Sequence, residues 1–338
     1  MLKVLLLSFL LLFPLEAKDY TKHSQAKVVM KTLQKKYGFS KSELNRLFST
    51  VKVQKTALRV FIPKHKRKKR KDTRTQSQKD KAKMLYSKYG SWGRYSRLVV
   101  NEKRVNEGIS YIKKYQNVFN KVEKKYGVPQ EYIAAIIGIE SAFGKNVGKY
   151  PVFDTLSTLA FEKNRRNKFF TKELIKFLHL SKTERFNPKN VYGSYAGAIG
   201  LVQFMPSNYK AYGVDFNKDG RITLQRAPDA IASVANYFKK NGWRTGEAVA
   251  TRVKYEGTRF NQYKTGYKRS YQRRHLKGIS PRTTWDYNNK VRLIKLNKKY
   301  YDELWYGAKN FFVITRYNHS AYYAMAVHQL AEQIKKGL

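Results

Sequence analysis

Apolar residues recur at helical spacing along most of the chain, which predicts a mainly helical protein. Residues 25–62 have this pattern, and Ser40 with Glu43 forms a capping box that predicts a helix start inside this range. Residues 101–126 form a second amphipathic stretch, and Gly127 is expected to end it because glycine is common just beyond helix C-termini.

Two further helices and two strands are expected in the rest of the chain. A helix should begin at Pro129, since proline is favoured in the first turn, and a last helix should cover about 320–336. Residues 291–296 and 311–315 alternate or run apolar with β-branched and aromatic side chains, which predicts strands. The pattern therefore indicates a mainly α protein with a small β-containing section near the C-terminus.

Residues 1–17 have the layout of a secretory signal peptide. Lys3 precedes a twelve-residue run, 4–15, that is apolar except for two positions, and Ala17 offers a small residue for cleavage. This run is shorter than the roughly 20 residues that a membrane-spanning helix needs. We expect cleavage and export, with a retained N-terminal anchor as the alternative.

Residues 63–83 differ in composition from the rest of the chain. They contain eleven Lys or Arg against two Asp and almost no apolar side chains. Such a segment buries too little surface to offset its ordering entropy, so a solvated loop or linker is expected. It either adheres electrostatically to an anionic partner or has no specific ligand.

Charge and cysteine content narrow the functional classes. The 338 residues carry a formal net charge of +47, which removal of residues 1–17 leaves unchanged, and such a surface attracts polyanions and anionic matrices. The chain has no cysteine. Disulfides, thiolate metal sites, cysteine nucleophiles and lipid attachment through cysteine are therefore excluded.

Glu140 lies at an unusual position for a carboxylate. Three isoleucines precede it by seven, four and three residues: Ile133, Ile136 and Ile137. These offsets place the carboxyl group on the apolar face of the expected helix, where desolvation should raise its pKa. A general acid needs this property. The structural alternative is an ion pair with Lys145 or Lys149.

Residues 193–206 contain three glycines within eight positions, followed by Gln203 and aromatic residues. Glycines permit close approach of the backbone to a ligand, and the amide of Gln203 can hydrogen-bond a sugar hydroxyl. Such runs also form tight turns without any ligand.

Five segments of the chain closely resemble the membrane-bound lytic murein transglycosylase B family. In chain order they are Tyr126–Pro129, Ile137–Ser141, Gly193–Ser207, Asp229–Phe238 and Ile314–Asn318. The similarity covers most of residues 95–255 and 305–335. It implies a mainly α (α+β) fold: a lysozyme-like helical core with an extra helical domain and a small β domain.

The resemblance also implies domain limits. They are a signal peptide at 1–17, an N-terminal helical domain at 18–125 with the basic segment 63–83, a lysozyme-like catalytic core at 126–250 with an EF-hand-like loop at 215–229, a small β-containing domain at 251–315, and a C-terminal helix at 316–338 that returns to the helical domain and the groove.

A reaction follows from the same resemblance. Members of this family cleave the β-1,4 bond between N-acetylmuramic acid and N-acetylglucosamine in peptidoglycan and leave a 1,6-anhydro end. Glu140 matches the single catalytic acid, which protonates the glycosidic oxygen and then takes the proton of the C6 hydroxyl. The family's substrate positions match Tyr95, Arg165, Arg166, Ser194, Gln203, Tyr237, Tyr317, Asn318 and Tyr323. The structural alternatives are core or rim aromatics and, for the two arginines, a solvated pair.

A site with one carboxylate suits this reaction. Most glycosidases use two carboxylates that flank the scissile bond. The obvious candidates for a second carboxylate suit structural roles, because Asp154 has the context of a helix N-cap and Glu162 lies beside basic residues. With one carboxylate, the acetamido group of the substrate would support the developing cation.

Residues 215–229 resemble the start of an EF-hand loop. Oxygen side chains alternate and a glycine follows at the sixth position, but the twelfth position is Arg226 instead of Glu. The family has a longer loop, whose implied structural Ca²⁺ ligands match Asp215, Asn217, Asp219, the backbone carbonyl of Arg221, and Asp229. An unmetallated turn is the alternative. No cofactor is expected for catalysis.

The expected partners are peptidoglycan glycan strands, with other cell-wall enzymes left open. We expect no nucleic-acid partner, since no nucleic-acid motif accompanies the charge, and no transmembrane span after cleavage. The expected location is the periplasm, as a soluble protein bound to the cell wall. A hydrolysing muramidase of the same fold and a non-catalytic peptidoglycan-binding protein are the alternatives.

Overall fold

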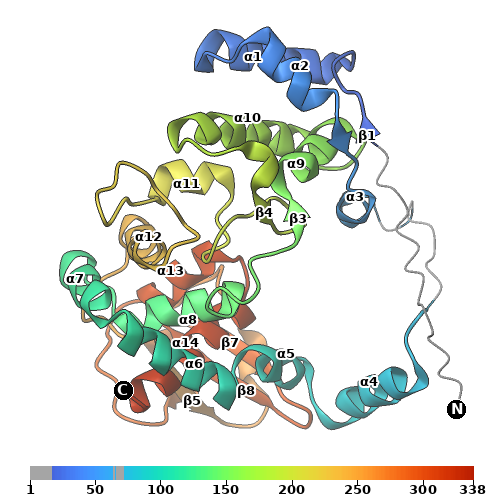
Figure 1. Cartoon of the computed structure of the whole chain (residues 1–338). Helices are drawn as coiled ribbons and strands as arrows, with labels where there is room; N and C mark the ends of the chain where they lie inside the picture. The colour runs from blue at the N-terminus through green and yellow to red at the C-terminus, as the bar shows by residue number, and fades with distance from the viewer. Residues whose placement is uncertain (1–16, 64, 66–71) are drawn as a thin grey trace, which may run out of the picture. The chain divides into compact units, whose positions relative to one another are not determined.

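The structure is a computed structural model that describes residues 17–63, 65 and 72–338 (Figure 1). Of the expected signal peptide only Ala17 belongs to the described residues, and most of the 64–71 stretch also lies outside them. The chain divides into two compact units. Unit 1 combines the described part of Met1–Arg67 with Lys149–Gly197, and unit 2 combines the described part of Lys68–Gly148 with Ala198–Leu338.

Unit 1 is a helical unit with two very short strand pairs. Its elements are β1 (Ala17–Lys18), α1 (Ser24–Tyr37), α2 (Lys41–Phe48), β2 (Val51–Lys52), α3 (Lys55–Phe61), β3 (Tyr150–Pro151), α9 (Val152–Phe161), α10 (Asn167–Thr183), the 3₁₀ turn η2 (Pro188–Asn190) and β4 (Tyr192–Gly193). Helix α9 is buried along its whole length and packs against α1, α3 and α10. It therefore forms the centre of this unit's core.

Unit 2 holds the remaining helices and one sheet. Its elements are α4 (Gln76–Lys88), α5 (Ser91–Val99), α6 (Glu102–Lys114), α7 (Gln116–Tyr126), α8 (Gln130–Ser141), α11 (Pro206–Tyr212), α12 (Ala227–Lys240), β5 (Ala250–Tyr255), η3 (Arg259–Gln262), η4 (Arg273–His275), β6 (Ile279–Pro281), β7 (Arg292–Asn297), β8 (Asp302–Gly307), α13 (Lys309–Tyr317) and α14 (Ala321–Lys336).

Helix α8 is the central helix of unit 2. Its sequence is apolar on nearly all sides, as expected for a helix that other helices surround. It packs against α6, α7, α12 and α14, which Figure 1 shows around it. Glu140 is the second-last residue of this helix, so the fold brings a carboxyl group to the end of a buried helix.

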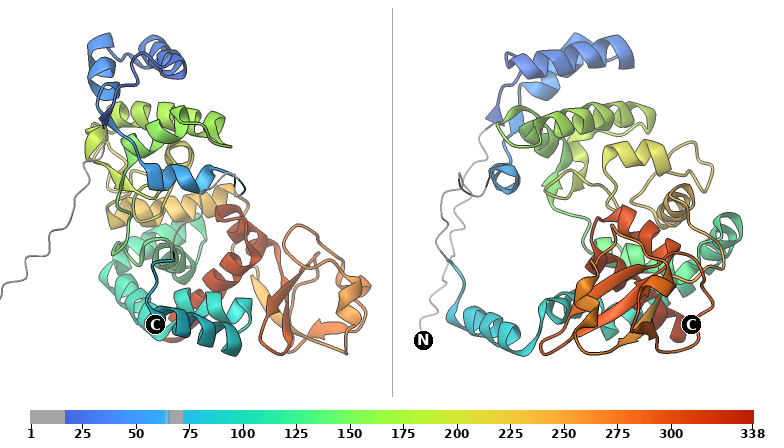
Figure 2. Two further views of the ribbon diagram at one scale, coloured as in Figure 1. Left: turned by 90° about the vertical axis from the view of Figure 1, so that its right-hand side faces the viewer. Right: turned by 180° about the vertical axis from the view of Figure 1, so that it is seen from behind.

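The sheet of unit 2 is antiparallel and four-stranded, with the order β6-β5-β8-β7 (Figure 2). It has a hydrophobic cluster of its own, built around Val291, Leu293, Leu304 and Tyr306. The prediction of a strand at 291–296 is confirmed by β7.

The prediction of a strand at 311–315 is wrong, because these residues lie in helix α13. The buried amide of Asn310 accepts a hydrogen bond from the Arg244 N–H and donates to the carbonyl oxygens of Arg244 and Glu247. These bonds fix the start of the helix against the loop after α12. Packing against α14 then overrides the strand preference of the local sequence.

Two predicted helical stretches are interrupted. Residues 25–62 form α1, α2 and α3 separated by turns, and the capping box of Ser40 and Glu43 is present at the start of α2. Residues 101–126 break at Tyr115 into α6 and α7, and Gly127 ends α7 with a φ of 65°. The last helix, α14, agrees with its prediction.

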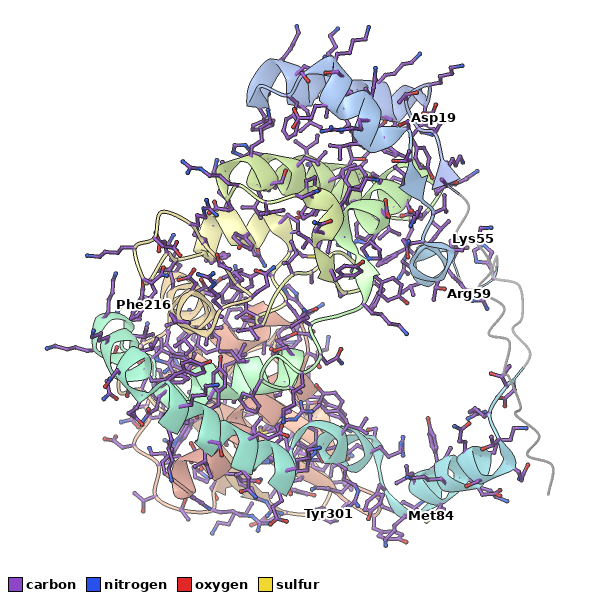
Figure 3. The ribbon with its side chains drawn as sticks, viewed as in Figure 1. Asp19, Lys55, Arg59, Met84, Phe216 and Tyr301 are labelled. Carbon is purple, nitrogen blue, oxygen red and sulfur yellow. The ribbon has the colours of Figure 1, made fainter. Side chains whose placement is uncertain are left out.

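The prediction of a loop over the whole of 63–83 is wrong for residues 76–83, which begin helix α4. Thr75 and Gln78 form a capping box that starts this helix. No residue of α4 is buried, so the expected solvation is observed. Met84, which follows the basic segment, is 52% exposed and is labelled in Figure 3.

Within the described residues, no helix combines the length and the apolar character that crossing a bilayer requires. Residues 72–125 group with the core helices and the sheet in unit 2, whereas 149–197 group with the N-terminal helices in unit 1.

Candidate active site

Glu140 is partly buried at the end of α8. Burial raises the pKa of its carboxyl group to about 7, although a hydrogen bond from Tyr323 acts in the opposite direction. Among the described residues Glu140 has no ion-pair partner. Lys145, one of the two lysines considered as a partner, pairs with Glu107 at 2.8 Å instead. Near neutral pH about half of these carboxyl groups therefore hold a proton that an ordinary glutamate would have lost.

Tyr323 is the direct neighbour of this carboxyl group. Its hydroxyl donates to Oε1 of Glu140 over 2.6 Å, across 183 positions of the chain. Ser320 caps α14 by accepting the backbone N–H of Tyr323, which fixes where the tyrosine stands. The ring of Tyr323 stacks on Tyr317 with centroids 6.3 Å apart.

Tyr317 belongs to an aromatic cluster beside Glu140. Its hydroxyl donates to the carbonyl oxygen of Val202 over 2.6 Å, and its ring lies 4.8 Å from that of Tyr237 and 5.8 Å from that of Phe204. Burial and the charge of Glu140 raise the pKa of the Tyr317 phenol well above its ordinary value. The cluster therefore packs α12, α13 and the glycine-rich turn against one another.

Tyr237 of α12 and Asn318 at the end of α13 differ in solvent exposure. Tyr237 is buried, and its hydroxyl donates to the carbonyl oxygen of Arg316, so it supports α13. Asn318 is exposed at the C-terminal end of α13. Only Asn318 of these two presents its side chain freely to solvent.

Gln203 lies in the glycine-rich turn with a positive φ of 48°. Its side-chain nitrogen donates to the carbonyl oxygens of Val147 and Gly200, each over 2.9 Å. The amide oxygen therefore remains as the acceptor that this side chain can offer a ligand. Gly200 is required here, because a Cβ atom would lie 2.6 Å from the carbonyl oxygen of Leu224 and its φ is +75°.

Tyr95 comes from α5 and also lies near Glu140. Burial raises the pKa of its phenol, and the negative charge of Glu140 adds to this effect. Its ring lies 6.0 Å from Tyr322 and 6.1 Å from Trp92. Unit 2 thus gathers Tyr95, Tyr317 and Tyr323 close to one carboxyl group.

Three of the sequence-predicted residues lie in unit 1, at other elements. Ser194 follows β4, and its hydroxyl accepts the N–H of Ala196. Arg165 and Arg166 are exposed at the start of α10, where the guanidinium of Arg166 lies 4.1 Å from the Phe169 ring centroid.

The two acids considered as second carboxylates also lie in unit 1 and have structural partners. Asp154 is the third residue of α9, so the N-cap prediction is wrong, and it lies 3.5 Å from Lys189. Glu162 pairs with Lys18 at 2.6 Å, a partner distant in sequence. Burial tends to raise the pKa of Glu162, but hydrogen bonds from Lys18 and Tyr20 bring it below its ordinary value.

Sequence reasoning missed the residues that fix the end of α8. Arg104 donates to the carbonyl oxygen of Gly138 over 2.6 Å. Ala142 and Phe143 have φ values of 50° and 57°, and the chain turns so that the Phe143 ring covers Gly138. A Cβ atom at Gly138 would lie 2.7 Å from Phe143 Cζ, so only glycine leaves room for this ring. A glycine inside an apolar helix was therefore the sequence signal that could have indicated the close contact.

The loop at 215–229 has the chemistry of a calcium site. Asp215 accepts the N–H groups of Asp219 and Gly220, and Asp229 accepts those of Phe216 and Thr223, so the carboxylates hold both ends of the loop. In the described part of the chain, no three His, Cys, Asp or Glu side chains are gathered into a cation site by themselves. The loop therefore has carboxylate, amide and carbonyl oxygens, the donor types that Ca²⁺ takes, without three acids gathered around one point.

Comparison with known proteins gives consistent matches. The model of a family described as Transglycosylase SLT domain matches residues 22–332. Membrane-bound lytic murein transglycosylase B of Escherichia coli (strain K12) is 35% identical over 317 residues, which cover 94% of this chain and 84% of that protein.

Solved structures agree with these matches. The E. coli lytic transglycosylase Slt35 in complex with bulgecin A has a TM-score of 0.83 and 34% identity, with 95% of this chain and 96% of that chain covered. A second structure of Slt35, in complex with calcium, gives the same values. Soluble lytic transglycosylase SltB1 from Pseudomonas aeruginosa has a TM-score of 0.78 and 36% identity over 93% of this chain and 98% of that one. These matches confirm the expected mainly α fold class with a lysozyme-like core.

Proposed function

Because this chain belongs to the Transglycosylase SLT domain family and is a lytic transglycosylase acting on peptidoglycan, we propose that Glu140 is its single catalytic acid and base. The observation that carries this proposal is the partly buried carboxyl group with a pKa of about 7. A group with such a pKa exists in both protonation states near neutral pH, as two successive proton transfers require.

In the proposed first step, protonated Glu140 donates its proton to the glycosidic oxygen of the β-1,4 bond between N-acetylmuramic acid and N-acetylglucosamine. The bond from C1 of the muramoyl sugar to this oxygen breaks, and N-acetylglucosamine leaves with a free 4-hydroxyl. The acetamido oxygen of the muramoyl sugar bonds to C1 in its place. Because Tyr323 occupies Oε1 of Glu140, the proton is carried by Oε2.

In the second step, the Glu140 carboxylate takes the proton of the C6 hydroxyl while that oxygen bonds to C1. The bond from C1 to the acetamido oxygen breaks, and a 1,6-anhydro end results. During the reaction the carboxylate is formed by the first step and consumed by the second, and the Tyr323 hydroxyl donates to it in between. A hydrogen bond to a charged acceptor is stronger than one to a neutral acceptor, so Tyr323 stabilises the carboxylate and favours release of the proton in the first step.

We further propose that the glycan binds along the residues that the sequence singled out. Tyr323 contacts Glu140, and Tyr95 and Tyr317 lie near enough to feel its charge. Gln203 offers its amide oxygen, and Asn318 presents an exposed amide. Tyr237 acts through α13 by its bond to Arg316. The proposed contributions of unit 1 are Ser194, Arg165 and Arg166, the two arginines toward substrate carboxylates.

The proposed calcium ligands are Asp215, Asn217, Asp219, the carbonyl of Arg221, and Asp229. Their oxygen chemistry supports this assignment, as does the calcium complex of Slt35, to which this chain is 34% identical. Bound calcium would stabilise the loop between α11 and α12 and supply no step of the reaction.

We propose that the protein is exported to the periplasm after cleavage of residues 1–17 and binds the cell wall as a soluble enzyme. The net charge of +47 supports attraction to carboxylates of peptidoglycan. Glycan strands are the proposed partner, without nucleic acid, and association with other cell-wall enzymes is open. The domain limits from the sequence are kept as a proposal.

Mass spectrometry of soluble products from purified peptidoglycan sacculi tests the mechanism. Wild type should release anhydro-ended muropeptides and Glu140→Gln none. Glu131→Gln is a matched control, because Glu131 is buried in the same helix and burial raises its pKa as well. Reducing-end products would show a hydrolysing muramidase, and an active Glu140→Gln variant would refute the assignment of the acid.

A further inference from the structure

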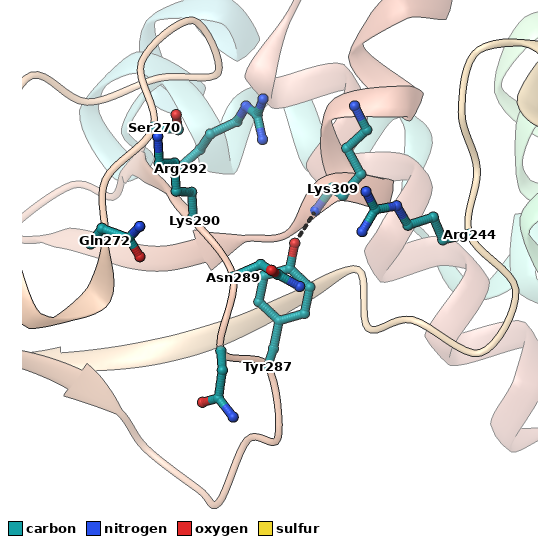
Figure 4. A pocket seen from close by; sticks show the side chains of 9 residues that line it. Arg244, Ser270, Gln272, Tyr287, Asn289, Lys290, Arg292 and Lys309 are labelled. Atoms are coloured by element: carbon teal, nitrogen blue, oxygen red, sulfur yellow. Dashed lines mark hydrogen bonds between the residues drawn. The ribbon is translucent and has the colours of Figure 1, made fainter.

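A pocket of about 430 Å³ lies in unit 2 at the small sheet and its loops, and it shares no lining residue with the aromatic cluster at Glu140. Figure 4 shows the side chains that line it. Four of them are cations, and none is a carboxylate: Arg244, Lys290, Arg292 and Lys309. Basic residues are common in this chain, so the charge alone does not distinguish this pocket.

Arg292 distinguishes this pocket from the rest of the basic surface, because its guanidinium is partly buried and held in place by the fold. Its Nε donates to the carbonyl oxygen of Tyr267 over 2.9 Å, and its guanidinium lies 4.1 Å from the Phe312 ring centroid. Burial lowers the pKa of Arg292, and no described carboxylate pairs with it. The two terminal nitrogens remain to bind an oxyanion, for which the planar guanidinium is suited.

One carboxylate lies nearby. Glu247 pairs with Arg244 at 2.8 Å and so compensates one of the four cations. Figure 4 shows Arg244 and Arg292 extending into the pocket from opposite sides. The hydroxyl of Tyr287 accepts the backbone N–H of Lys309 over 3.0 Å, which fixes the ring between them. The pocket therefore keeps a surplus of positive charge on side chains that the fold positions.

The neutral lining residues indicate the chemistry of the ligand. Gln272, Asn288 and Asn289 each offer both a donor and an acceptor, which complements the N–H and C=O groups of a peptide. A phosphate polymer without donors would leave the amide oxygens unused. Tyr287 is only 5% exposed and offers no ring face on which a nucleic-acid base could stack.

A second pocket of about 430 Å³ adjoins the first and extends the basic surface. It shares Gln272 and Asn288 with the first pocket and adds Arg273 and Arg274. A ligand that occupies both pockets carries more than one negative charge and has an extended shape.

Helix α13 connects this pocket with the proposed active site. Lys309, its first residue, lines the pocket, and Tyr317, its last, stacks on Tyr323 beside Glu140. Eight helical steps correspond to about 12 Å. An extended peptide of about four residues spans this length.

We propose that this pocket binds the acidic stem peptides of peptidoglycan, at a site separate from the one that cleaves the glycan. The proposal rests on the proposed function, because it takes the glycan to lie at Glu140. The pocket holds a peptide branch about one helix length from the scissile bond and so favours peptide-bearing glycan over bare glycan.

Isothermal titration with stem peptides, released from peptidoglycan by an amidase, tests the site. The variant Lys290→Gln/Arg292→Gln should bind these peptides at least tenfold more weakly than wild type. Lys254→Gln/Lys299→Gln removes the same charge from exposed positions outside the pocket and should bind them as wild type does. Equal binding by both variants, or no binding by wild type, would overturn the proposal. Tighter, pocket-dependent binding of polyphosphate would assign the site to a phosphate polymer instead.

Steady-state kinetics adds a second readout. The pocket variant should raise KM for peptide-bearing glycan at least threefold relative to peptide-free glycan, and an unchanged ratio would contradict the role in substrate choice. Glu140→Gln should keep peptide binding, so an active Glu140→Gln enzyme refutes the proposed acid without touching the pocket. If the double variant fails to fold, Ser270→Glu places a carboxylate at the exposed rim and should weaken peptide binding tenfold.

Discussion

Glu140→Gln is expected to stabilise the protein at alkaline pH while it removes the proposed catalytic acid. An unfolded glutamate has a pKa of 4.5, and burial raises the pKa of Glu140 to about 7 in the folded protein. The folded state therefore binds the proton more tightly, and its stability falls as pH rises from 4.5 through 7. With about 1.4 kcal/mol per pKa unit, the cost reaches about 3 kcal/mol at pH 8 and is below about 0.5 kcal/mol at pH 4.5.

Glutamine cannot ionise, so the variant avoids this pH-dependent cost. A buried amide brings its own unpaired donor, which costs about 1–3 kcal/mol but does not change with pH. The quantity to measure is therefore the difference in Tm between variant and wild type at pH 8 minus the same difference at pH 4.5. For a unit of roughly 200 residues, about 3 kcal/mol corresponds to about 6–12 °C.

Tryptophan fluorescence during thermal unfolding suits this measurement, because all four tryptophans lie in unit 2 with Glu140. Asp286→Asn is the control, since it removes an exposed carboxylate from the same unit and should show no pH-dependent gain. A gain for Glu140→Gln that is equal at both pH values, or a loss that grows at pH 8, would refute a raised pKa for this group.

Three further predictions concern Tyr323, the glycine inside α8 and the proposed calcium loop. In Tyr323→Phe the hydrogen bond that lowers the pKa of Glu140 is lost, so the alkaline limb of kcat/KM should move upward by about 0.5–1.5 pH units; a downward shift would contradict this. Gly138→Ala should destabilise unit 2 by about 1–3 kcal/mol in urea unfolding, because the new methyl group would collide with Phe143, and an unchanged midpoint would show that the ring can move. Calcium at 100 times its Kd should stabilise wild type by about 2.7 kcal/mol, and a chelator should remove this gain; Asp219→Ala should show neither effect, and an equal response of this variant would place the ion elsewhere.

The sequence predicts those parts of the fold that local rules determine. Ser40 with Glu43 and Gly127 mark helix ends, and the structure has both signals where the pattern puts them. The strand prediction for residues 311–315 fails because their helical state depends on Asn310, whose amide donates to two carbonyl oxygens of a distant loop. No local pattern contains that information.

The candidate site also combines a residue that local sequence predicts with contacts that only the fold reveals. Three isoleucines at helical offsets are enough to indicate a desolvated carboxyl group at Glu140, and burial does raise its pKa. The bond from Tyr323 spans 183 positions, so only the folded chain reveals it. The basic pocket was missed because its residues come from irregular loops and from the ends of β7 and α13, where no periodicity exists.

The bond between Tyr323 and Glu140 also has a consequence for biosynthesis. Tyr323 lies 183 positions after the glutamate that it contacts, so the carboxyl group is synthesised long before the phenol. A nascent or prematurely ended polypeptide can contain the acid but lacks both the phenol beside it and helix α14, against which α8 packs. A chain cut before Tyr323 is therefore expected to leave Glu140 without the hydrogen bond and the helix packing that position it.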